Sequence, residues 1–310
     1  MHEHRRQWIR GAVASTLSAV AAPWWMSSPA SAALQPVATK RIMASGELIP
    51  TVGVGTARRY AGASSEAQLA PLRDALRLFV REGGKVVDTA PSYGDAESVL
   101  GLLIEQAGLR DSLFLATKVN ATGREDGIAQ IEQSFKNLRT DRIDLIAVHN
   151  LRDVATQLQV LREFKGKGLV RYIGLTTSST SQHEEMARLI RSEAIDFVQV
   201  DYAIDHREAE KNVLRAAVEQ NVAVMVNLPF GRGRVFEAVR DKPLPDWAAE
   251  LDIKSWAQFF LKYLISHKAV TCVIPGTATA AHALDNTGAM RGRLPDPFQR
   301  DRMAALISRV

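Results

Sequence analysis

The sequence has a single cysteine, Cys272, so no disulfide can form within the chain. This residue lies in the apolar run of residues 270–274, where we expect a buried core thiol and not a nucleophile. The chain also lacks metal-ligand spacing, because His183, His206 and His267 are scattered. Hydrolase or lyase chemistry, which needs a metal cluster or a nucleophile, is therefore not expected.

A strong charge imbalance is missing as well. The 39 Lys and Arg against 34 Asp and Glu give a formal charge of +5, which falls to +3 without residues 1–32, since these carry three Arg and one Glu. This balance is too mild to indicate nucleic-acid binding. From residue 41 onward there is no low-complexity linker, solenoid repeat or break in composition, which favours one domain of about 270 residues.

The first 32 residues differ from the rest of the chain. They contain the basic segment RRQWIR at residues 5–10, a weakly apolar run at residues 11–22, and small residues ending in Ala30-Ser31-Ala32. We expect a signal peptide cleaved after Ala32, followed by a catalytic domain at residues 33–310. The paired arginines are typical of twin-arginine export to the periplasm, although His4 replaces the usual Ser or Thr. The alternative is an uncleaved amphipathic or membrane-anchoring segment, but its apolar part is shorter than the ~20 residues of a spanning helix.

Short apolar runs alternate with helical patterns from residue 52 onward. The expected strands are residues 52–55, 85–89, 113–118, 144–149, 170–176, 197–202, 222–227 and 271–274. The expected helices include residues 66–81, 125–138, 154–167, 184–191 and 208–220. Eight apolar strands separated by helices indicate an α/β fold with a buried parallel sheet, either a (β/α)8 TIM barrel or a doubly wound open sheet. Residues 41–50 predict an N-terminal β-hairpin that plugs the bottom of a barrel.

Polar side chains stand at the carboxyl ends of the expected strands, where barrels keep their chemistry. They are Asp88 with Tyr93 just beyond it, Lys118, His149, Thr176, Gln199 and Asn227. Each has an ordinary structural alternative: Asp88 as a cap or turn former, Lys118 as a solvated surface group, and His149 as a helix-capping residue. Together, four ionisable groups that close three successive strands favour a catalytic site.

This grouping suits carbonyl reduction. Hydride addition to a carbonyl builds negative charge on oxygen, which then needs a proton near neutral pH. A tyrosine alone is a reluctant proton donor, but the adjacent ammonium of Lys118 would stabilise its ionised form. Asp88 would hold Lys118 in place, and His149 would orient the substrate oxygen. Tyr93 is then the proton donor in reduction and the acceptor in oxidation.

The chain resembles the aldo-keto reductase family over nearly all of residues 41–290. The resemblance lies in the segments DTAPSYG (88–94), ATK (116–118), DLIAVHN (144–150) and IPGT (274–277), with Gln199 and the pair Asp285-Asn286. It implies a (β/α)8 barrel that binds an extended nicotinamide dinucleotide, with Asp88, Tyr93, Lys118 and His149 as catalytic tetrad. The cofactor contacts that it implies or that lie nearby are Gly55, Thr56, Thr176, Thr177, Gln199, Asn227, Arg232, Arg234, Pro275, Gly276, Thr277, His282, Asp285 and Asn286.

The chain departs from the family pattern around the nicotinamide. Relatives usually have Ser-Asn after the fifth strand to bind the carboxamide, whereas this chain has Thr176-Thr177. An aromatic residue commonly ends the seventh strand, and here the residue is Asn227, with Phe230 three residues on. A cofactor-binding barrel with little turnover, acting as a redox sensor or partner-binding subunit, is therefore the alternative to an enzyme.

The phosphate end also differs. In many relatives basic residues hold the 2′-phosphate of NADP at the positions of Gly276 and His282. Arg232 and Arg234 are candidates to replace them, unless they lie on a solvated surface loop. NADP remains the expected cofactor, with NAD as the alternative, loaded before export. The short loop at residues 151–153 predicts an open, shallow site for small carbonyls, sugars or lactone-related compounds.

Overall fold

The computed structural model describes residues 36–309. The predicted signal peptide lies outside the described residues, so its cleavage after Ala32 stays a prediction. Among residues 36–309, no helix is both long and apolar enough to cross a membrane.

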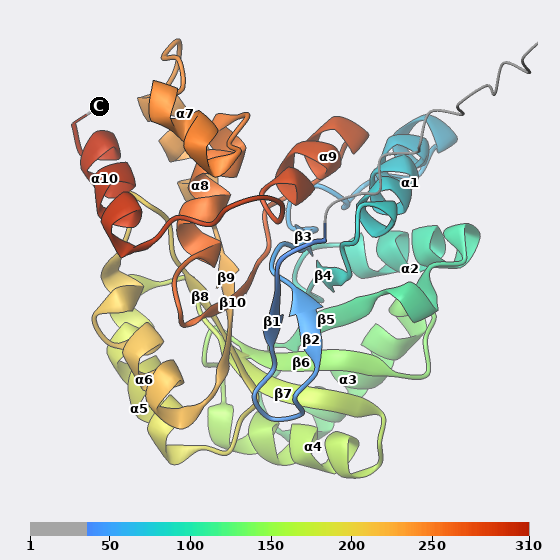
Figure 1. Cartoon of the computed structure of the whole chain (residues 1–310). Coiled ribbons are helices and arrows are strands. Elements are labelled where there is room, and N and C mark those ends of the chain that lie inside the picture. The colour runs from blue at the N-terminus through green and yellow to red at the C-terminus, as the bar shows by residue number, and fades with distance from the viewer. Residues whose placement is uncertain (1–35, 310) are drawn as a thin grey trace, which may run out of the picture. The chain divides into compact units, whose positions relative to one another are not determined.

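An eight-stranded sheet forms the centre of the domain, and its strands are neighbours in chain order. They are β3 (Val54–Gly55), β4 (Val86–Asp88), β5 (Phe114–Val119), β6 (Ile143–His149), β7 (Val170–Thr176), β8 (Phe197–Asp201), β9 (Ala223–Asn227) and β10 (Val270–Val273). All neighbouring strands are parallel. Parallel bridges Val52–Val273 and Gly55–Gly276 join the first strand to the last. The sheet is therefore closed, which confirms the predicted (β/α)8 barrel and excludes an open sheet (Figure 1).

Helices alternate with the strands and cover the outside of the barrel (Figure 1). They are α1 (Glu66–Arg81), α2 (Ala96–Ala107), α3 (Arg124–Leu138), α4 (Val154–Gly166), α5 (His183–Ser192), α6 (Val213–Gln220), α7 (Arg234–Ala238), α8 (Trp256–Ile265), α9 (Ala280–Gly288) and α10 (Pro297–Ile307). The continuous helix predicted for residues 208–220 is wrong at its start. A 3-10 turn at Glu208–Glu210 comes first, and Asn212, with φ −125° and ψ −59°, separates it from α6.

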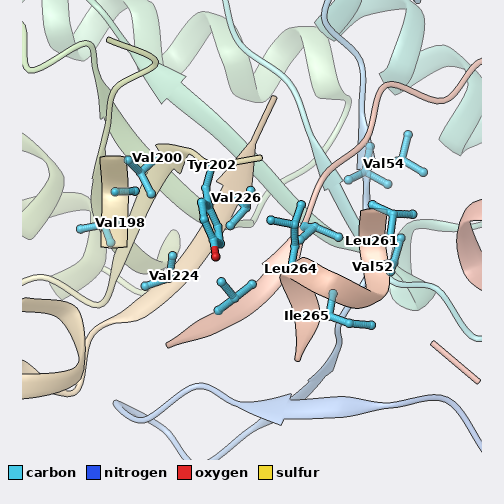
Figure 2. Close-up of a cluster of buried hydrophobic side chains, with 14 of the residues drawn as sticks. Val52, Val54, Val198, Val200, Tyr202, Val224, Val226, Leu261, Leu264 and Ile265 are labelled. Carbon is cyan, nitrogen blue, oxygen red and sulfur yellow. The ribbon is translucent and has the colours of Figure 1, made fainter. Parts of the chain in front are cut away.

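The larger core layer lies between the sheet and the helices. Because side chains alternate across a strand, every second strand residue points out of the barrel. Figure 2 shows part of this layer, with valines of β8 and β9 and apolar residues of α8 in the same buried cluster. The labelled residues of these elements are Val198, Val200, Val224, Val226, Leu261, Leu264 and Ile265. This layer attaches the helices to the barrel.

A two-stranded hairpin precedes the barrel, as predicted. Its strands β1 (Thr39–Arg41) and β2 (Leu48–Pro50) pair antiparallel. Gly46 in the turn has φ +79°, a conformation that glycine adopts without strain. Ile42 and Ile49 are fully buried in the cluster of inward-facing strand residues. The hairpin therefore closes one end of the barrel interior.

Next to the hairpin, the interior is filled by aromatic rings. Phe114, Tyr172 and Phe197 lie with ring centroids 5.5–5.9 Å apart. The Tyr172 hydroxyl lies 2.6 Å from Ser45 Oγ and 2.8 Å from Glu47 Oε2 in the hairpin turn. These contacts hold the hairpin against the sheet. We call the end of the barrel interior that the hairpin covers the closed end.

Cys272 belongs to the same interior cluster and is fully buried. Burial raises the pKa of its thiol, because the thiolate loses its hydration. The prediction of a core residue is confirmed.

Candidate active site

At the other end of the interior, the inward positions carry polar side chains, and we call this the open end. Lys118 on β5 donates hydrogen bonds to both carboxylate oxygens of Asp88 on β4, at 2.9 and 2.8 Å, and to the carbonyl of Thr89 at 2.7 Å. Lys118 is only 1% exposed, so a solvated lysine is excluded. Burial works to lower the pKa of Lys118, but the charges and hydrogen bonds of Asp88 and Tyr93 outweigh it and raise that pKa. Lys118 is therefore an ammonium at neutral pH.

A second contact fixes Asp88. The side-chain amide of Gln199 donates to Asp88 Oδ1 at 2.8 Å, and its oxygen accepts from Thr176 Oγ1 at 2.9 Å. Thr176 and Gln199 are register partners on β7 and β8. Gln199 thus supports the carboxylate that holds Lys118, a role that the sequence did not reveal.

Tyr93 lies in the loop between β4 and α2. Its ring centroid is 5.0 Å from Lys118 Nζ and 6.1 Å from the ring centroid of His149, with the two rings nearly perpendicular. The loop is held by its own backbone, since Tyr93 N donates to the carbonyl of Ala90 at 3.1 Å. The structure therefore brings together the four residues that the sequence predicted as catalytic tetrad.

His149 ends β6 with its ring partly buried. Burial, and then the positive charge of Lys118, lower the pKa of His149 to about 4, so its imidazole is neutral near pH 7. Its Nδ1 lies 3.3 Å from Ser92 Oγ. When the Ser92 hydroxyl donates to Nδ1, the ring proton resides on Nε2, which is then a hydrogen-bond donor for a substrate oxygen.

The tetrad residues Asp88, Tyr93 and His149 line a cavity of about 760 Å³. Six of the predicted cofactor contacts line the same cavity: Gly55, Thr176, Gln199, Asn227, Arg232 and Gly276. Lys118 lies behind Asp88, to which it is bonded. This volume lies within the usual range of small-molecule binding sites.

The other predicted contacts do not line this cavity. Thr56, Thr177, Pro275, Thr277 and Asn286 are buried around it. Asn286 donates to the Thr277 hydroxyl, which in turn donates to the Pro275 carbonyl. These bonds stabilise the turn that leads from β10 to α9.

Three further predicted contacts lie on or near the surface. Asp285 accepts hydrogen bonds from Ser255 and Gln258, and His282 is exposed on α9. Arg234 pairs with Asp205 at 2.6 Å and borders a smaller neighbouring cavity. Arg234 is thus already neutralised, whereas Arg232 lines the main cavity.

The cavity fits a nicotinamide by its donors and acceptors. Asn227 donates to the Thr177 carbonyl at 3.0 Å, while its buried Oδ1 has no hydrogen-bond partner among the described residues. This oxygen would accept from a carboxamide NH2, the pairing that Thr176 and Thr177 lack. Phe230 also lines the cavity and packs on Phe236 at 4.8 Å between centroids. An amide acceptor and an aromatic ring are therefore both present.

Sequence reasoning missed several residues of the cavity wall, among them Arg58 and Arg59, which follow β3. It included Ser92 in the segment 88–94 but gave it no role beside His149. The two arginines could have been found from the sequence, because they follow the carboxyl end of the first strand, where barrels place their functional residues. Among residues 36–309, no group of His, Cys, Asp and Glu side chains is arranged to hold a metal ion.

Comparison with known proteins agrees with this geometry. Residues 51–301 match the family described as the aldo/keto reductase family. The methylglyoxal reductase YeaE of Escherichia coli is 30% identical over 264 residues, which cover 82% of this chain and 90% of that protein. Pyridoxine 4-dehydrogenase of E. coli is 29% identical over 247 residues, or 73% of this chain and 82% of that protein.

Among solved structures, an aldo/keto reductase of Klebsiella pneumoniae in complex with NADP and acetate superposes with a TM-score of 0.73. It is 25% identical, and the match covers 87% of this chain and 96% of that one. With the barrel, the tetrad and these relatives in agreement, the chain belongs to the aldo/keto reductase family of oxidoreductases.

Proposed function

We propose that the protein reduces a small aldehyde or ketone with NADPH, with Tyr93 as the proton donor. The observation that carries this proposal is the placement of Lys118, which is bonded to Asp88 on one side and faces the Tyr93 ring on the other. This arrangement keeps a buried ammonium next to the phenol. A phenolate that forms there is stabilised by its charge.

Each residue has a distinct role in the reaction. A bound reduced nicotinamide supplies the hydride that adds to the carbonyl carbon. Tyr93 gives its hydroxyl proton to the carbonyl oxygen, and solvent later restores that proton. Lys118 stabilises the phenolate, and Asp88 with Gln199 holds Lys118 in position. His149, neutral at pH 7, donates a hydrogen bond from Nε2 to the same oxygen and orients it.

The same residues catalyse the reverse reaction when the alcohol is in excess. Tyr93 then accepts the alcohol proton. NADP is the proposed cofactor, because the Klebsiella relative binds it and because Arg232 lines the cavity as a cation for its phosphates. Asn227, Phe230 and Gly55 are the proposed contacts of the nicotinamide end.

Methylglyoxal is the first substrate to test, since the E. coli relative is named for its reduction. We expect the purified protein to oxidise NADPH in its presence, and the Tyr93→Phe variant to be strongly impaired. Pyridoxal and a panel of aldehydes and quinones extend the test. Equal residual rates in both proteins would remove the proposed role of Tyr93 and favour the alternative, a barrel that binds cofactor with little turnover.

We infer from the sequence pattern that the protein is exported to the periplasm by the twin-arginine machinery. The support is the segment RRQWIR and the small residues before position 33. Cell fractionation with Arg5→Lys and Arg6→Lys combined should leave the protein in the cytoplasm. A double variant that still reaches the periplasm contradicts this route.

An exported enzyme of this kind needs its cofactor outside the cytoplasm. We propose that NADP binds before export and remains bound, because the twin-arginine route carries folded proteins. Heat-denatured protein from the periplasm should then release a nicotinamide dinucleotide that mass spectrometry detects. A preparation without released nucleotide contradicts cofactor loading before export.

A further inference from the structure

Two strand ends meet where the barrel closes. Gly55 ends β3 and forms a parallel bridge with Gly276, which follows β10. Gly55 N donates to the carbonyl of Pro275 at 3.0 Å, and a Cβ added to Gly55 would lie 2.8 Å from the carbonyl oxygen of Ile274. Both glycines line the catalytic cavity. The close approach of the strands therefore leaves two positions of the cavity wall without side chains.

The segment from β10 to the end of α9 contains no lysine or arginine. The family pattern has basic residues at the positions of Gly276 and His282, where they hold the 2′-phosphate of NADP. In this chain His282 is exposed on α9 and does not line the cavity. The first turn of α9 still favours an anion, because the dipole of a helix is positive at its N-terminus. An anion that binds beside Gly276 therefore needs its cation from another element.

Arg59, from the loop between β3 and α1, lies where this cation is needed. Its Nε is 3.4 Å and its Cγ 3.6 Å from the place that a Cβ on Gly276 would take. The arginine side chain thus crosses over Gly276 and fills the space that a side chain there would enter. Arg59 also lines the catalytic cavity. Among the described residues, none forms an ion pair or a hydrogen bond with its guanidinium group, so its charge is available to a ligand.

Local hydrogen bonds fix where Arg59 leaves the backbone. The Thr56 carbonyl accepts hydrogen bonds from Arg59 N at 2.9 Å and from Tyr60 N at 3.2 Å. Thr56 N in turn donates to the carbonyl of Asp88 at 3.0 Å, which anchors the start of the loop. Tyr60, the next residue, is fully buried. The position of Arg59 over Gly276 is therefore a consequence of the fold.

The two arginines after β9 are placed differently. The sequence favours Arg232 and Arg234 as replacements for the missing basic residues. Arg234 is bonded to Asp205 through two of its nitrogens, at 2.6 and 3.1 Å. Arg232 lines the main cavity and also the smaller neighbouring cavity, whose other walls include residues after β8. Apart from the chain neighbours of Gly276, the described atoms within 4 Å of its Cβ position all belong to Arg59.

We propose that Arg59 binds the 2′-phosphate of NADP above Gly276 and thereby makes the site prefer NADP to NAD. This inference rests on the cofactor of the proposed function. A guanidinium binds a phosphate through paired, charge-assisted hydrogen bonds. NAD has a hydroxyl in place of that phosphate and forms no ion pair there. The cation that selects the cofactor thus comes from the loop after the first strand, across the barrel closure from residue 276.

Binding of the two reduced cofactors, followed by their fluorescence, tests the proposal without turnover. For Arg59→Ala we expect the Kd of NADPH to rise about 10- to 100-fold, because a charged contact is lost. The Kd of NADH should change by less than about 3-fold, since NADH does not make this contact. Arg215→Ala, an exposed arginine on α6, is the matched control and should change neither constant. Equal losses for both cofactors assign Arg59 to the pyrophosphate that they share and overturn the proposal, and so do two unchanged constants.

Moving the cation to residue 276 tests its place. In the double variant Arg59→Ala, Gly276→Lys, the new side chain starts in the space that Arg59 vacates. The φ of Gly276 is not positive, so lysine suits this backbone. We expect the double variant to bind NADPH at least about 5-fold more tightly than Arg59→Ala does, with NADH unchanged. A double variant that binds NADPH as weakly as Arg59→Ala contradicts the placement of the phosphate above Gly276.

Calorimetry separates this inference from the reductase function. The ligands are 2′,5′-ADP, which carries the 2′-phosphate of NADP, and ADP, which carries only a diphosphate at the 5′ position. Neither contains nicotinamide, so no turnover is needed. Weaker binding of 2′,5′-ADP but not of ADP by Arg59→Ala supports the site even when the wild-type protein reduces no carbonyl. Equal binding of 2′,5′-ADP by the variant and the wild type contradicts the site even when carbonyls are reduced.

Discussion

The two ends of the barrel interior are built by the same strands but differ in composition, since one end is packed with aromatic rings and the other holds a buried ion pair. At the closed end, Phe114 and Phe197 fill the space and meet the hairpin. Further along the same two strands, Lys118 and Gln199 surround the carboxylate of Asp88. Moving four residues along β5 changes the interior from aromatic packing to a buried ion pair.

This contrast separates stability from chemistry within one core. Apolar burial at the closed end stabilises the fold without specific partners. The open end holds buried charges, which are costly unless every one is paired. The barrel therefore tolerates a desolvated Lys118 because Asp88 and the Thr89 carbonyl accept hydrogen bonds from its ammonium.

The sharpest test of this separation is the same substitution at both ends. Tyr93→Phe removes the proposed proton donor, and we expect kcat to fall about 10²- to 10⁴-fold. Tyr172→Phe at the closed end removes only the hydroxyl contacts with Ser45, Glu47 and Arg171, with a loss of about 1 kcal/mol of stability and an unchanged kcat. Steady-state kinetics of both variants measure the change in kcat, and thermal melting measures the change in stability. Similar kinetic losses in the two would show that the ends are not independent.

The next largest effect is expected at the buried ion pair. Lys118→Met leaves the Asp88 carboxylate without its cation, which costs about 3–5 kcal/mol of stability. It should also remove most of the activity, because the phenolate of Tyr93 loses its neighbouring charge. Lys118 is therefore expected to contribute both to stability and to catalysis.

Lys262 is the matched control for that variant. It is equally buried, but it donates to the carbonyls of Leu251, Arg291 and Arg293 outside the barrel interior. We expect Lys262→Met to lower the melting temperature and to leave kcat unchanged. Denaturant unfolding and kinetics at saturating substrate measure the two effects. A Lys118→Met enzyme with wild-type kcat contradicts the role given to the ammonium.

The sequence was sufficient to predict the open end because of a simple geometric rule. Asp88, Lys118 and His149 are polar residues at the last inward positions of their strands, and a barrel brings such ends together. The closed end was also predictable, since residues 41–50 carry turn chemistry between short apolar runs. Both predictions depend on patterns that are local in the chain.

Contacts between distant segments could not be predicted in this way. Gln199 is predicted as a cofactor contact and lines the cavity, but the sequence does not show that its amide bonds Asp88, 111 residues away. Arg58 and Arg59 lie beside Tyr93 only because backbone bonds at Thr56 and Gly62 hold their loop there. No periodicity reveals such bonds, because they depend on the final positions of several strands. The predicted helix at residues 208–220 failed for a related reason, since its apolar pattern continues across a break in the backbone.

At the closed end, Phe197→Ala should produce a purely structural defect. Removing the ring leaves a cavity between Phe114 and Tyr172, at an expected cost of about 3–5 kcal/mol. The folded fraction should retain the wild-type kcat and KM at low temperature. Chemical denaturation gives the stability, and active-site titration with NADPH gives the folded fraction. A loss of kcat per active site comparable to that of Lys118→Met would show that closed-end packing also positions the catalytic residues.

The smallest expected effect is the pH dependence that His149 adds to stability. Its pKa lies at about 4 in the folded protein, below the value of 6.5 in an unfolded chain. Between these values the unfolded chain binds a proton that the folded protein excludes. The contribution of His149 is therefore full above pH 6.5 and is lost as the pH falls towards 4.

His149→Gln removes this titration and should reduce the loss of stability between pH 7 and pH 5 by about 1 kcal/mol or less, because the ring is partly exposed. His267 has a pKa lowered to about 4 by burial, and then by the charge of Arg300, but it lies away from the catalytic cavity. His267→Gln should give a similar gain in acid tolerance without any kinetic change, whereas His149→Gln should also lower kcat/KM. Melting temperatures at the two pH values measure the first effect, and initial rates measure the second. A His149→Gln protein that is as acid-sensitive as the wild type shows that folding does not lower the pKa of His149, which contradicts the effect assigned to burial and to Lys118.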